Sequence, residues 1–154
     1  MSKKLYQGGA MTEYERTAWI MLVTTVPAYA IYATVVLINA GEGPLHEADY
    51  QWPMLITIGA VILANIVLGI VMGIALGMAL GRGVALVDER DRQIERMGER
   101  VGSSFIVLGG VAALLMALAE WHWFWIANTL FLGFVVAGVV SSIAKVSAYR
   151  WSAR

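Results

Sequence analysis

The sequence predicts an all-α polytopic membrane protein with four transmembrane helices in two antiparallel hairpins and both termini in the cytoplasm. Composition supports this class, because 59% of the residues are hydrophobic and only 14% are charged. The distribution of charge gives the topology. All eleven Lys and Arg fall within residues 1–16, 82–100 and 145–154, which leaves 17–81 and 101–144 without a basic residue. Each of these two stretches is long enough to cross a bilayer twice.

The orientation follows from the same distribution. Short segments rich in Lys and Arg stay on the cytoplasmic side, so we expect both termini and the loop at 82–100 to lie inside. The segments 41–52 and 120–123 carry acidic and aromatic residues and no basic residue. We therefore expect them to be the outer loops of a single membrane domain, residues 1–154, in a prokaryotic plasma (inner) membrane.

The first predicted span covers about residues 17–40. Its helix is expected to begin near Thr12, because Thr12-Glu13-Tyr14-Glu15 has the pattern of a capping box. Pro27 is expected to kink the helix, with the hydroxyls of Thr24 and Thr25 available for the carbonyl group that proline leaves unbonded.

The second predicted span, residues 53–80, carries a row of glycines at four-residue spacing. The row has the pattern of a glycine zipper and consists, with one preceding amide on the same ridge, of Asn65, Gly69, Gly73, Gly77 and Gly81. Small residues let membrane helices approach closely, so these residues are predicted to pack helices together, either within the chain or in a homo-oligomer. Asn65 is predicted to form an interhelical hydrogen bond rather than to contact a solute.

The third and fourth predicted spans, residues 101–119 and 124–144, repeat the small-residue pattern. Gly109, Ala113 and Ala117 share one ridge, and Gly133, Ala137 and Ser141 share another. Tyr and Trp residues at the span ends are expected to anchor the helices at the membrane surfaces. These anchors are Tyr50, Trp52, Trp121, Trp123 and Trp125 outside, and Tyr14, Trp19, Tyr149 and Trp151 inside.

The chain has no recognisable catalytic constellation, so we predict that it is not an enzyme and needs no cofactor. It has no Cys, which excludes disulfides, thiolate nucleophiles and cysteine metal ligands. No Asp, Glu, Lys, Arg or His lies at the central depth of a predicted span, whereas ion and proton pathways usually place such groups there. The only metal-binding candidates, which are weak, are His46, His122 and Glu120 in the outer loops. We predict no metal site.

The charged loop at 82–100 is the most specific motif. On a helix, Arg92, Arg96 and Arg100 form one row and Asp91, Glu95 and Glu99 form an adjacent row. Such balanced charge favours neither a polybasic lipid anchor nor a nucleic-acid site. One interpretation is a solvated cytoplasmic helix that leads into the third span. The other is a surface that binds a protein partner through Asp88, Glu89, Arg90, Asp91, Arg92, Glu95, Arg96, Glu99 and Arg100.

The string DERDRQIERMGERVG, after a glycine-rich span and before an aromatic hairpin and a basic tail, is similar to a group of small bacterial and archaeal four-helix membrane proteins. Loops of that group read DERD, then Ile, then Gly-x-Arg. The resemblance covers about residues 80–150 and implies the four-helix architecture, but it implies no activity or catalytic residue. Members are often encoded beside small helix-turn-helix regulators, which implies a role in regulation or immunity.

Two functional hypotheses follow. In the first, the chain is a non-enzymatic regulatory, immunity or accessory membrane subunit whose charged cytoplasmic helix binds a protein partner. In the second, copies of the chain assemble in the bilayer through their glycine faces into a small transporter or channel lined near Asn65. The first predicts a stoichiometric partner, and the second predicts solute flux.

Overall fold

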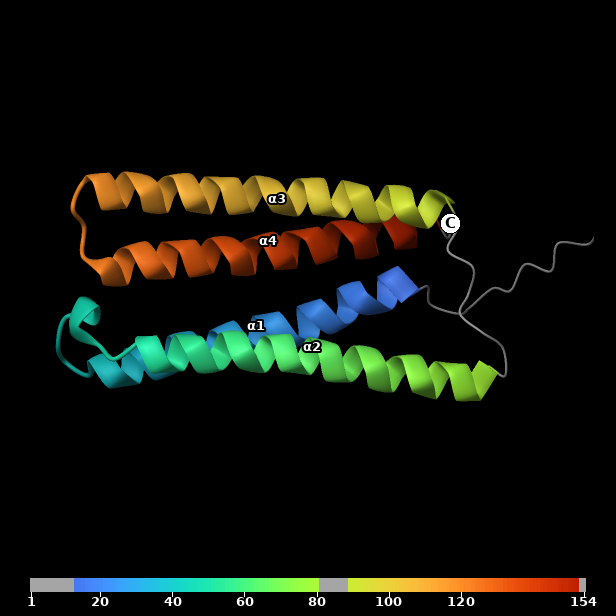
Figure 1. Cartoon of the computed structure of the whole chain (residues 1–154), viewed down its shortest axis with the longest axis horizontal. Helices are drawn as coiled ribbons and strands as arrows, with labels where there is room; N and C mark the ends of the chain where they lie inside the picture. Colours follow the sequence, from blue (N-terminus) through green and yellow to red (C-terminus); the bar gives the residue numbers. More distant parts are fainter. Residues whose placement is uncertain (1–12, 81–88, 153–154) are drawn as a thin grey trace, which may run out of the picture.

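The described part of the computed structural model, residues 13–80 and 89–152, consists almost entirely of four long helices (Figure 1). Helix α1 spans Glu13–Ala40, α2 spans Gln51–Leu80, α3 spans Glu89–Leu118 and α4 spans Trp123–Ser152. A single turn of 3-10 helix, η1, covers Leu45–Glu47. All four long helices have the length and apolar composition needed to cross a membrane. The predicted all-helical class and the membrane character are confirmed.

The helices are longer than a bilayer core requires. Helix α1 has 28 residues and α2, α3 and α4 have 30 each, which corresponds to about 42–45 Å at about 1.5 Å per residue. The hydrocarbon core is about 30 Å thick. The spans predicted at 101–119 and 124–144 correspond to the apolar parts of α3 and α4. Helix α3 already begins at Glu89, and α4 continues through Lys145 and Arg150, because charge ends a membrane span without ending a helix.

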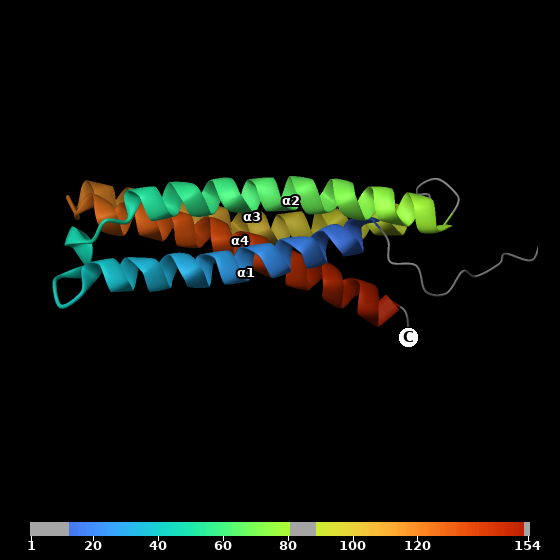
Figure 2. The ribbon, with the colours of Figure 1, turned by 90° about the horizontal axis from the view of Figure 1, so that it is seen from below.

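Helices α1 and α4 occupy the middle of the arrangement. Helix α4 packs along α3 on one side and against α1 on the other, and α2 packs chiefly against α1 (Figures 1 and 2). The beginnings of α1 and α3 and the ends of α2 and α4 lie at one end of the bundle, which we call the basic end. The turn between α1 and α2, with η1, and the turn between α3 and α4 lie at the other end, which we call the histidine end (Figure 1).

The turns at the histidine end use the left-handed backbone conformation. Gly41 follows α1 with a φ of 55°, and Glu120 follows α3 with the same φ. After α3, the N–H of Trp121 donates to the carbonyl of Met116 and the N–H of Glu120 donates to that of Ala117. This is a Schellman arrangement, which normally places glycine where Glu120 stands. The left-handed conformation of Glu120 is therefore part of the turn that ends α3.

A small aromatic core lies beneath these turns. Its buried members are Tyr32, Val36, Ala48, Tyr50 and Phe124. The rings of Tyr50 and Phe124 meet edge to face with centroids 5.0 Å apart. Tyr50 was predicted as a surface anchor, and this was wrong: it is only 8% exposed, because the segment with η1 folds back over the helix ends. Trp52, Trp121 and Trp123 are exposed, as anchors would be.

Helices α3 and α4 approach closely through small residues. A Cβ atom added to Gly109 would lie 2.9 Å from the Cα of Gly133, and one added to Gly102 would lie 2.9 Å from the carbonyl oxygen of Ala137. Ala113 and Ala137 are buried in the same interface. The predicted use of small residues in the third and fourth spans is confirmed at these positions.

Candidate docking site

The described charged segment, Glu89–Arg100, is the first two fifths of α3, and contacts with α4 fix its rotation. Ile94 and Gly98 are buried on the side that faces α4. Gly98 leaves room for the side chain of Lys145, since an added Cβ atom would lie 2.5 Å from its Cγ. The segment 82–100 was predicted as a charged cytoplasmic connection, with a helix leading into the third span as one interpretation. From Glu89 onward the segment is helical and continuous with the apolar part of α3.

One ion pair joins the two helices in this region. Lys145 Nζ of α4 donates to Glu95 Oε1 of α3 at 2.6 Å. Both side chains are largely shielded, with 13% and 22% of their surfaces exposed. The sequence prediction missed this pair, because it assigned Glu95 to a ladder within α3 and Lys145 to a terminal basic tail. The available signal was Gly98, one turn after Ile94, which marks the face that lies against another helix.

The pairing of Glu95 changes the charge balance of α3. Arg92, Arg96 and Arg100 are exposed in one row, while Glu95 is held by α4. Of the other predicted docking residues, Glu89, Arg90 and Glu99 are exposed and Asp91 is half-buried, and Asp88 lies outside the described residues. The described part of α3 therefore presents its arginines outward, with Glu89 and Glu99 among them, and directs Glu95 toward α4. Arginine at such a row suits carboxylate groups, which it binds through two parallel hydrogen bonds.

A shallow depression lies beside the arginine row. Its volume is about 300 Å³, and its lining residues are Arg90, Gln93, Ile94, Met97 and Ala148. Ile94, Met97 and Ala148 give it an apolar floor between α3 and α4, and Arg90 and Gln93 give it a polar rim. Nearby, the Arg150 guanidinium lies 5.6 Å from the centre of the Trp19 ring, a cation–π contact that joins α4 to α1.

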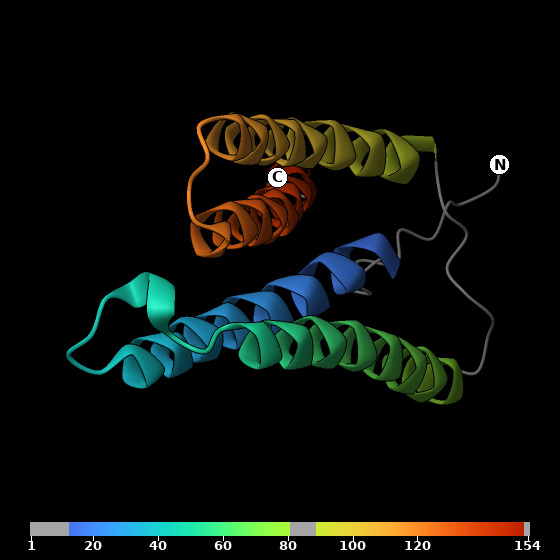
Figure 3. The same ribbon diagram turned by 60° about the vertical axis from the view of Figure 1, so that its left-hand side comes forward.

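The predicted glycine row of α2 has a different environment. A Cβ atom added to Gly69 or Gly73 would meet no atom within 4 Å. The prediction that these two glycines pack against another helix of the same chain is therefore wrong. The second half of α2 leans away from the other helices (Figure 3). Gly81 lies outside the described residues, as do the surroundings of Gly77. Contact between copies of the chain stays a prediction.

Asn65 does form the predicted interhelical hydrogen bond. Its Nδ2 donates to the hydroxyl of Thr24 in α1 at 3.0 Å and to the carbonyl of Val61 at 2.8 Å. The Thr24 hydroxyl in turn donates to the carbonyl of Ile20. The Thr24 hydroxyl is therefore not bonded to the carbonyl of Val23, which is the one that Pro27 leaves without an N–H donor. The amide of Asn65 is thus used in joining α2 to α1.

The two histidines, which come from separate turns, lie together. Their ring centroids are 5.1 Å apart. His122 Nδ1 accepts a hydrogen bond from the backbone N–H of Phe124, so this nitrogen is used at the beginning of α4. Within residues 13–80 and 89–152, no three His, Asp or Glu side chains form a group that could hold a metal ion. The geometry gives no support to a metal site with Glu120.

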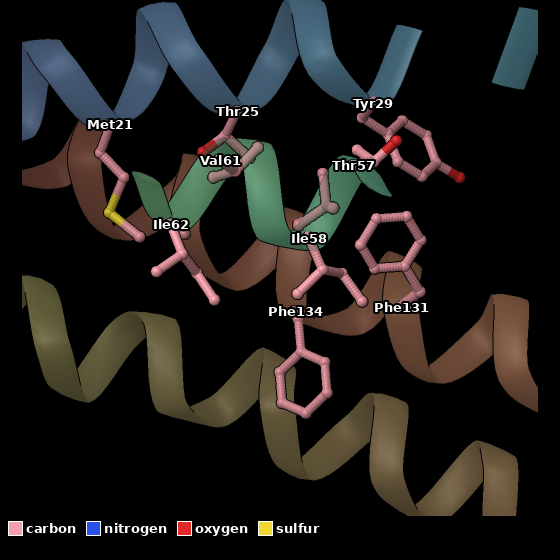
Figure 4. Close-up of a pocket in the computed structure, with 11 residues that line it drawn as sticks. Met21, Thr25, Tyr29, Thr57, Ile58, Val61, Ile62, Phe131 and Phe134 are labelled. Atoms are coloured by element: carbon pink, nitrogen blue, oxygen red, sulfur yellow. The ribbon is translucent and has the colours of Figure 1, made fainter. Parts of the chain in front are cut away.

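A cavity of about 290 Å³ lies between α1, α2 and α4 (Figure 4). Tyr29, Phe131 and Phe134 provide aromatic walls, and Ile58 and Ile62 of α2 face them. Its lining residues include no acid, base or histidine, so it contains no group for acid–base catalysis. The hydroxyl of Thr25, which also lines the cavity, is buried without a hydrogen-bond partner in the described structure.

Comparison with known proteins adds no assignment: the chain matches no protein-family model, no curated protein and no solved structure. The basic end of α3 and α4 therefore has to be interpreted from its own chemistry.

Proposed function

We propose that the chain is a non-enzymatic membrane subunit whose basic end binds a protein partner in the cytoplasm. In this proposal the bundle lies in a prokaryotic plasma membrane, in two antiparallel hairpins, with the basic end and both termini inside. The orientation rests on the positive-inside rule, since all Lys and Arg of the described residues belong to that end.

The observation that carries the proposal is the exposed arginine row on a fixed helix. Between Glu89 and Arg100, α3 extends about 18 Å, at about 1.5 Å per residue, before the apolar part begins. Contact with α4 through Ile94 and Gly98 holds this extension in one orientation. A partner would therefore meet preordered arginines, which reduces the ordering cost of binding.

The charge arrangement also indicates the kind of recognition. Glu95 is neutralised by Lys145, so an incoming acidic surface would meet the row Arg92, Arg96 and Arg100 without competition from that acid. Exposed charge pairs contribute mainly to the rate and orientation of association. Affinity would come from an apolar side chain placed in the depression over Ile94 and Met97. A regulatory, immunity or accessory role agrees with the resemblance in the charged segment.

The test is affinity purification from native membranes in mild detergent, followed by mass spectrometry. The wild type is compared with a variant carrying Arg92→Glu, Arg96→Glu and Arg100→Glu. A matched control replaces the same three arginines by lysine, which keeps the charge. We expect a stoichiometric partner with the wild type, reduced recovery with the lysine control and none with the glutamate variant.

Recovery of a pure homo-oligomer from all three proteins would contradict the docking role. Equal recovery of the partner with all three would also contradict it, because binding would then lie elsewhere. Each variant is first compared with the wild type by circular dichroism and size-exclusion chromatography, so that misfolding is recognised.

A second candidate is an oligomeric transporter or channel built around α2. It is favoured by one observation, the open faces of Gly69 and Gly73 on a helix that packs chiefly against α1. Flux of small ions and neutral solutes into proteoliposomes, compared between the wild type and Asn65→Leu, tests it. No flux above that of empty liposomes would exclude transport of the solutes used.

A further inference from the structure

The wall of the cavity between α1, α2 and α4 contains a buried hydroxyl that forms no hydrogen bond in the described structure. Thr25 is only 8% exposed, lines the cavity and has an unpartnered Oγ1 (Figure 4). It lies near the middle of α1, which is one of the candidate membrane spans. At that depth of a bilayer no water is at hand, so an unbonded polar group is especially unfavourable.

Other threonines of the bundle use their hydroxyls within their own helix. Thr24, Thr34 and Thr57 each donate to the carbonyl four residues earlier, at 2.8, 2.8 and 2.7 Å. The corresponding acceptor for Thr25 is the carbonyl of Met21, which already accepts a longer bond from Thr24 at 3.3 Å. Thr25 therefore has a donor that its helix does not use, on the side of α1 that lines the cavity.

The rest of the wall is apolar and partly aromatic. Tyr29, Phe131 and Phe134 contribute rings from α1 and α4, and the rings of Tyr29 and Phe131 lie with centroids 5.7 Å apart. Aromatic rings attract another ring in edge-to-face or offset-stacked arrangements. The volume of about 290 Å³ is near the lower limit of small-molecule sites, about 300 Å³. The cavity therefore suits a compact planar ring.

A water molecule is a poor partner for the Thr25 hydroxyl. Buried water usually makes about two to four hydrogen bonds. Among the other lining residues, Thr57 donates its hydroxyl proton to the carbonyl of Pro53, and the Tyr29 hydroxyl points away from Thr25 (Figure 4). A carbonyl oxygen needs a single donor and brings no proton that would stay unbonded. The wall therefore fits a carbonyl group on an otherwise apolar molecule.

The cavity is open on the side that a bilayer would cover. Ile62 of α2 and Phe134 of α4 line it and are 54% and 51% exposed. Helix α2 packs chiefly against α1 and not against α4. A ligand would therefore enter from the hydrocarbon of the membrane, which requires it to be lipid-soluble.

We infer that this cavity binds the ring of a planar, lipid-soluble carbonyl compound of the quinone class, with the Thr25 hydroxyl donating to a ring carbonyl oxygen. The aromatic side chains pack against the ring, and a hydrocarbon tail leaves between Ile62 and Phe134. Binding requires no electron transfer by the protein. It is independent of the docking role of the basic end, because the cavity belongs to the apolar parts of α1, α2 and α4.

The probe is menadione, a methylated naphthoquinone, and methylnaphthalene is the matched probe without carbonyl groups. Binding to the full chain in nanodiscs of phosphatidylethanolamine and phosphatidylglycerol is measured by equilibrium dialysis. Empty nanodiscs correct for partition into lipid, and the chain has no Cys with which menadione could react. We expect saturable, stoichiometric binding of menadione, and weaker binding of methylnaphthalene.

Thr25→Val removes the hydroxyl and keeps a side chain of similar shape. Thr34→Val is the matched control on the same helix, since that hydroxyl is bonded to the carbonyl of Ala30. One neutral hydrogen bond corresponds to about a three- to tenfold change in Kd. Thr25→Val should weaken menadione binding by this factor without weakening methylnaphthalene binding, and Thr34→Val should change neither.

A second variant fills the cavity. Gly138→Val adds a side chain to its wall, where an added Cβ atom lies 3.1 Å from the flexible end of Met21. It should abolish saturable binding of both probes. Gly110→Val is its control and should not, because a Cβ atom there meets nothing within 4 Å. Circular dichroism and size-exclusion chromatography identify any variant that misfolds.

Several outcomes would overturn the inference. One is the absence of saturable menadione binding to the wild type, and another is unchanged menadione binding in Thr25→Val or Gly138→Val. Equal affinity of the wild type for the two probes would overturn it too, since the cavity would then accept any apolar molecule. So would equal weakening of both probes by Thr25→Val, because the hydroxyl would then shape the wall and not bind a carbonyl group.

Discussion

The two halves of this bundle carry similar small-residue patterns and use them differently. In α3 and α4, Gly109 and Gly133 bring the two backbones into direct contact. In α2, Gly69 and Gly73 face open space, and α2 is joined to α1 partly by the side chain of Asn65. A glycine row therefore permits a close approach between helices but does not require one. Whether a helix makes that approach depends on the neighbour that the fold supplies.

The largest difference in stability is expected between substitutions at two adjacent glycines of α3. Gly109→Leu should destabilise the protein by about 3 kcal/mol, because the larger side chain must enter the backbone contact with Gly133. Gly110→Leu is the matched control, since a Cβ atom there meets nothing within 4 Å. Its effect should stay below about 0.5 kcal/mol. Unfolding in mixed detergent with SDS measures both, and equal effects would refute the assigned interface.

A smaller effect is expected from the ion pair that fixes the basic end. Lys145→Met should cost about 1.5–3 kcal/mol, because it leaves the shielded Glu95 carboxylate without its charged donor. Adding Glu95→Gln should recover part of this loss. Glu47→Gln is the exposed control and should change stability by less than about 0.5 kcal/mol, since its contact with His46 is long and solvated. If the loss of stability in the double variant equals the sum of the losses caused by Lys145→Met and Glu95→Gln alone, Lys145 and Glu95 are not coupled.

The two interhelical hydrogen bonds of asparagine side chains, Asn128 between α4 and α1 and Asn65 between α2 and α1, should also differ in strength. Tyr32 donates its hydroxyl proton to Asn128 Oδ1 at 2.6 Å, and this Tyr is only 2% exposed. Bonds of this kind average about 0.6 kcal/mol and reach about 1.7 kcal/mol. We expect Asn128→Leu to approach the upper value and Asn65→Leu the average, measured by the same unfolding assay. A larger cost for Asn65→Leu than for Asn128→Leu would contradict this ranking of the two bonds.

The smallest effect on the isolated chain is expected from Gly73→Leu. Since the added side chain meets no neighbour, the free energy of unfolding should change by less than about 0.5 kcal/mol. If copies associate through α2, light scattering in mild detergent should instead report a smaller assembly than for the wild type. A loss of stability comparable to that of Gly109→Leu would mean that α2 packs within the chain after all.

Much of the architecture could be predicted because it depends on local sequence. Long apolar runs require helices in a bilayer, and they predicted all four. Small residues at Gly109, Gly133 and Ala137 predicted a close helix contact, and the amide of Asn65 predicted an interhelical bond. The helix leading into the third span was predicted from the charge spacing. The end of the fourth helix was predicted less well, because Lys145 to Ser152 has polar residues but none that stops a helix.

The candidate site was only partly predictable. The arginine row follows from four-residue spacing, but the sequence does not say which charges face another helix. Glu95 pairs with Lys145 because of the register and rotation of α4 against α3, which are set by the glycine contacts. No local pattern relates two residues fifty positions apart.

The sequence alone determined that this protein is a bundle of four helices able to cross a membrane, since hydrophobic length and the lack of charge act within each helix. Only the tertiary structure decided which glycines meet another helix, which acid is neutralised, that Tyr50 is buried and that His46 meets His122. These properties depend on the distances and rotations between helices. They result from packing over the whole chain, and no single segment encodes them.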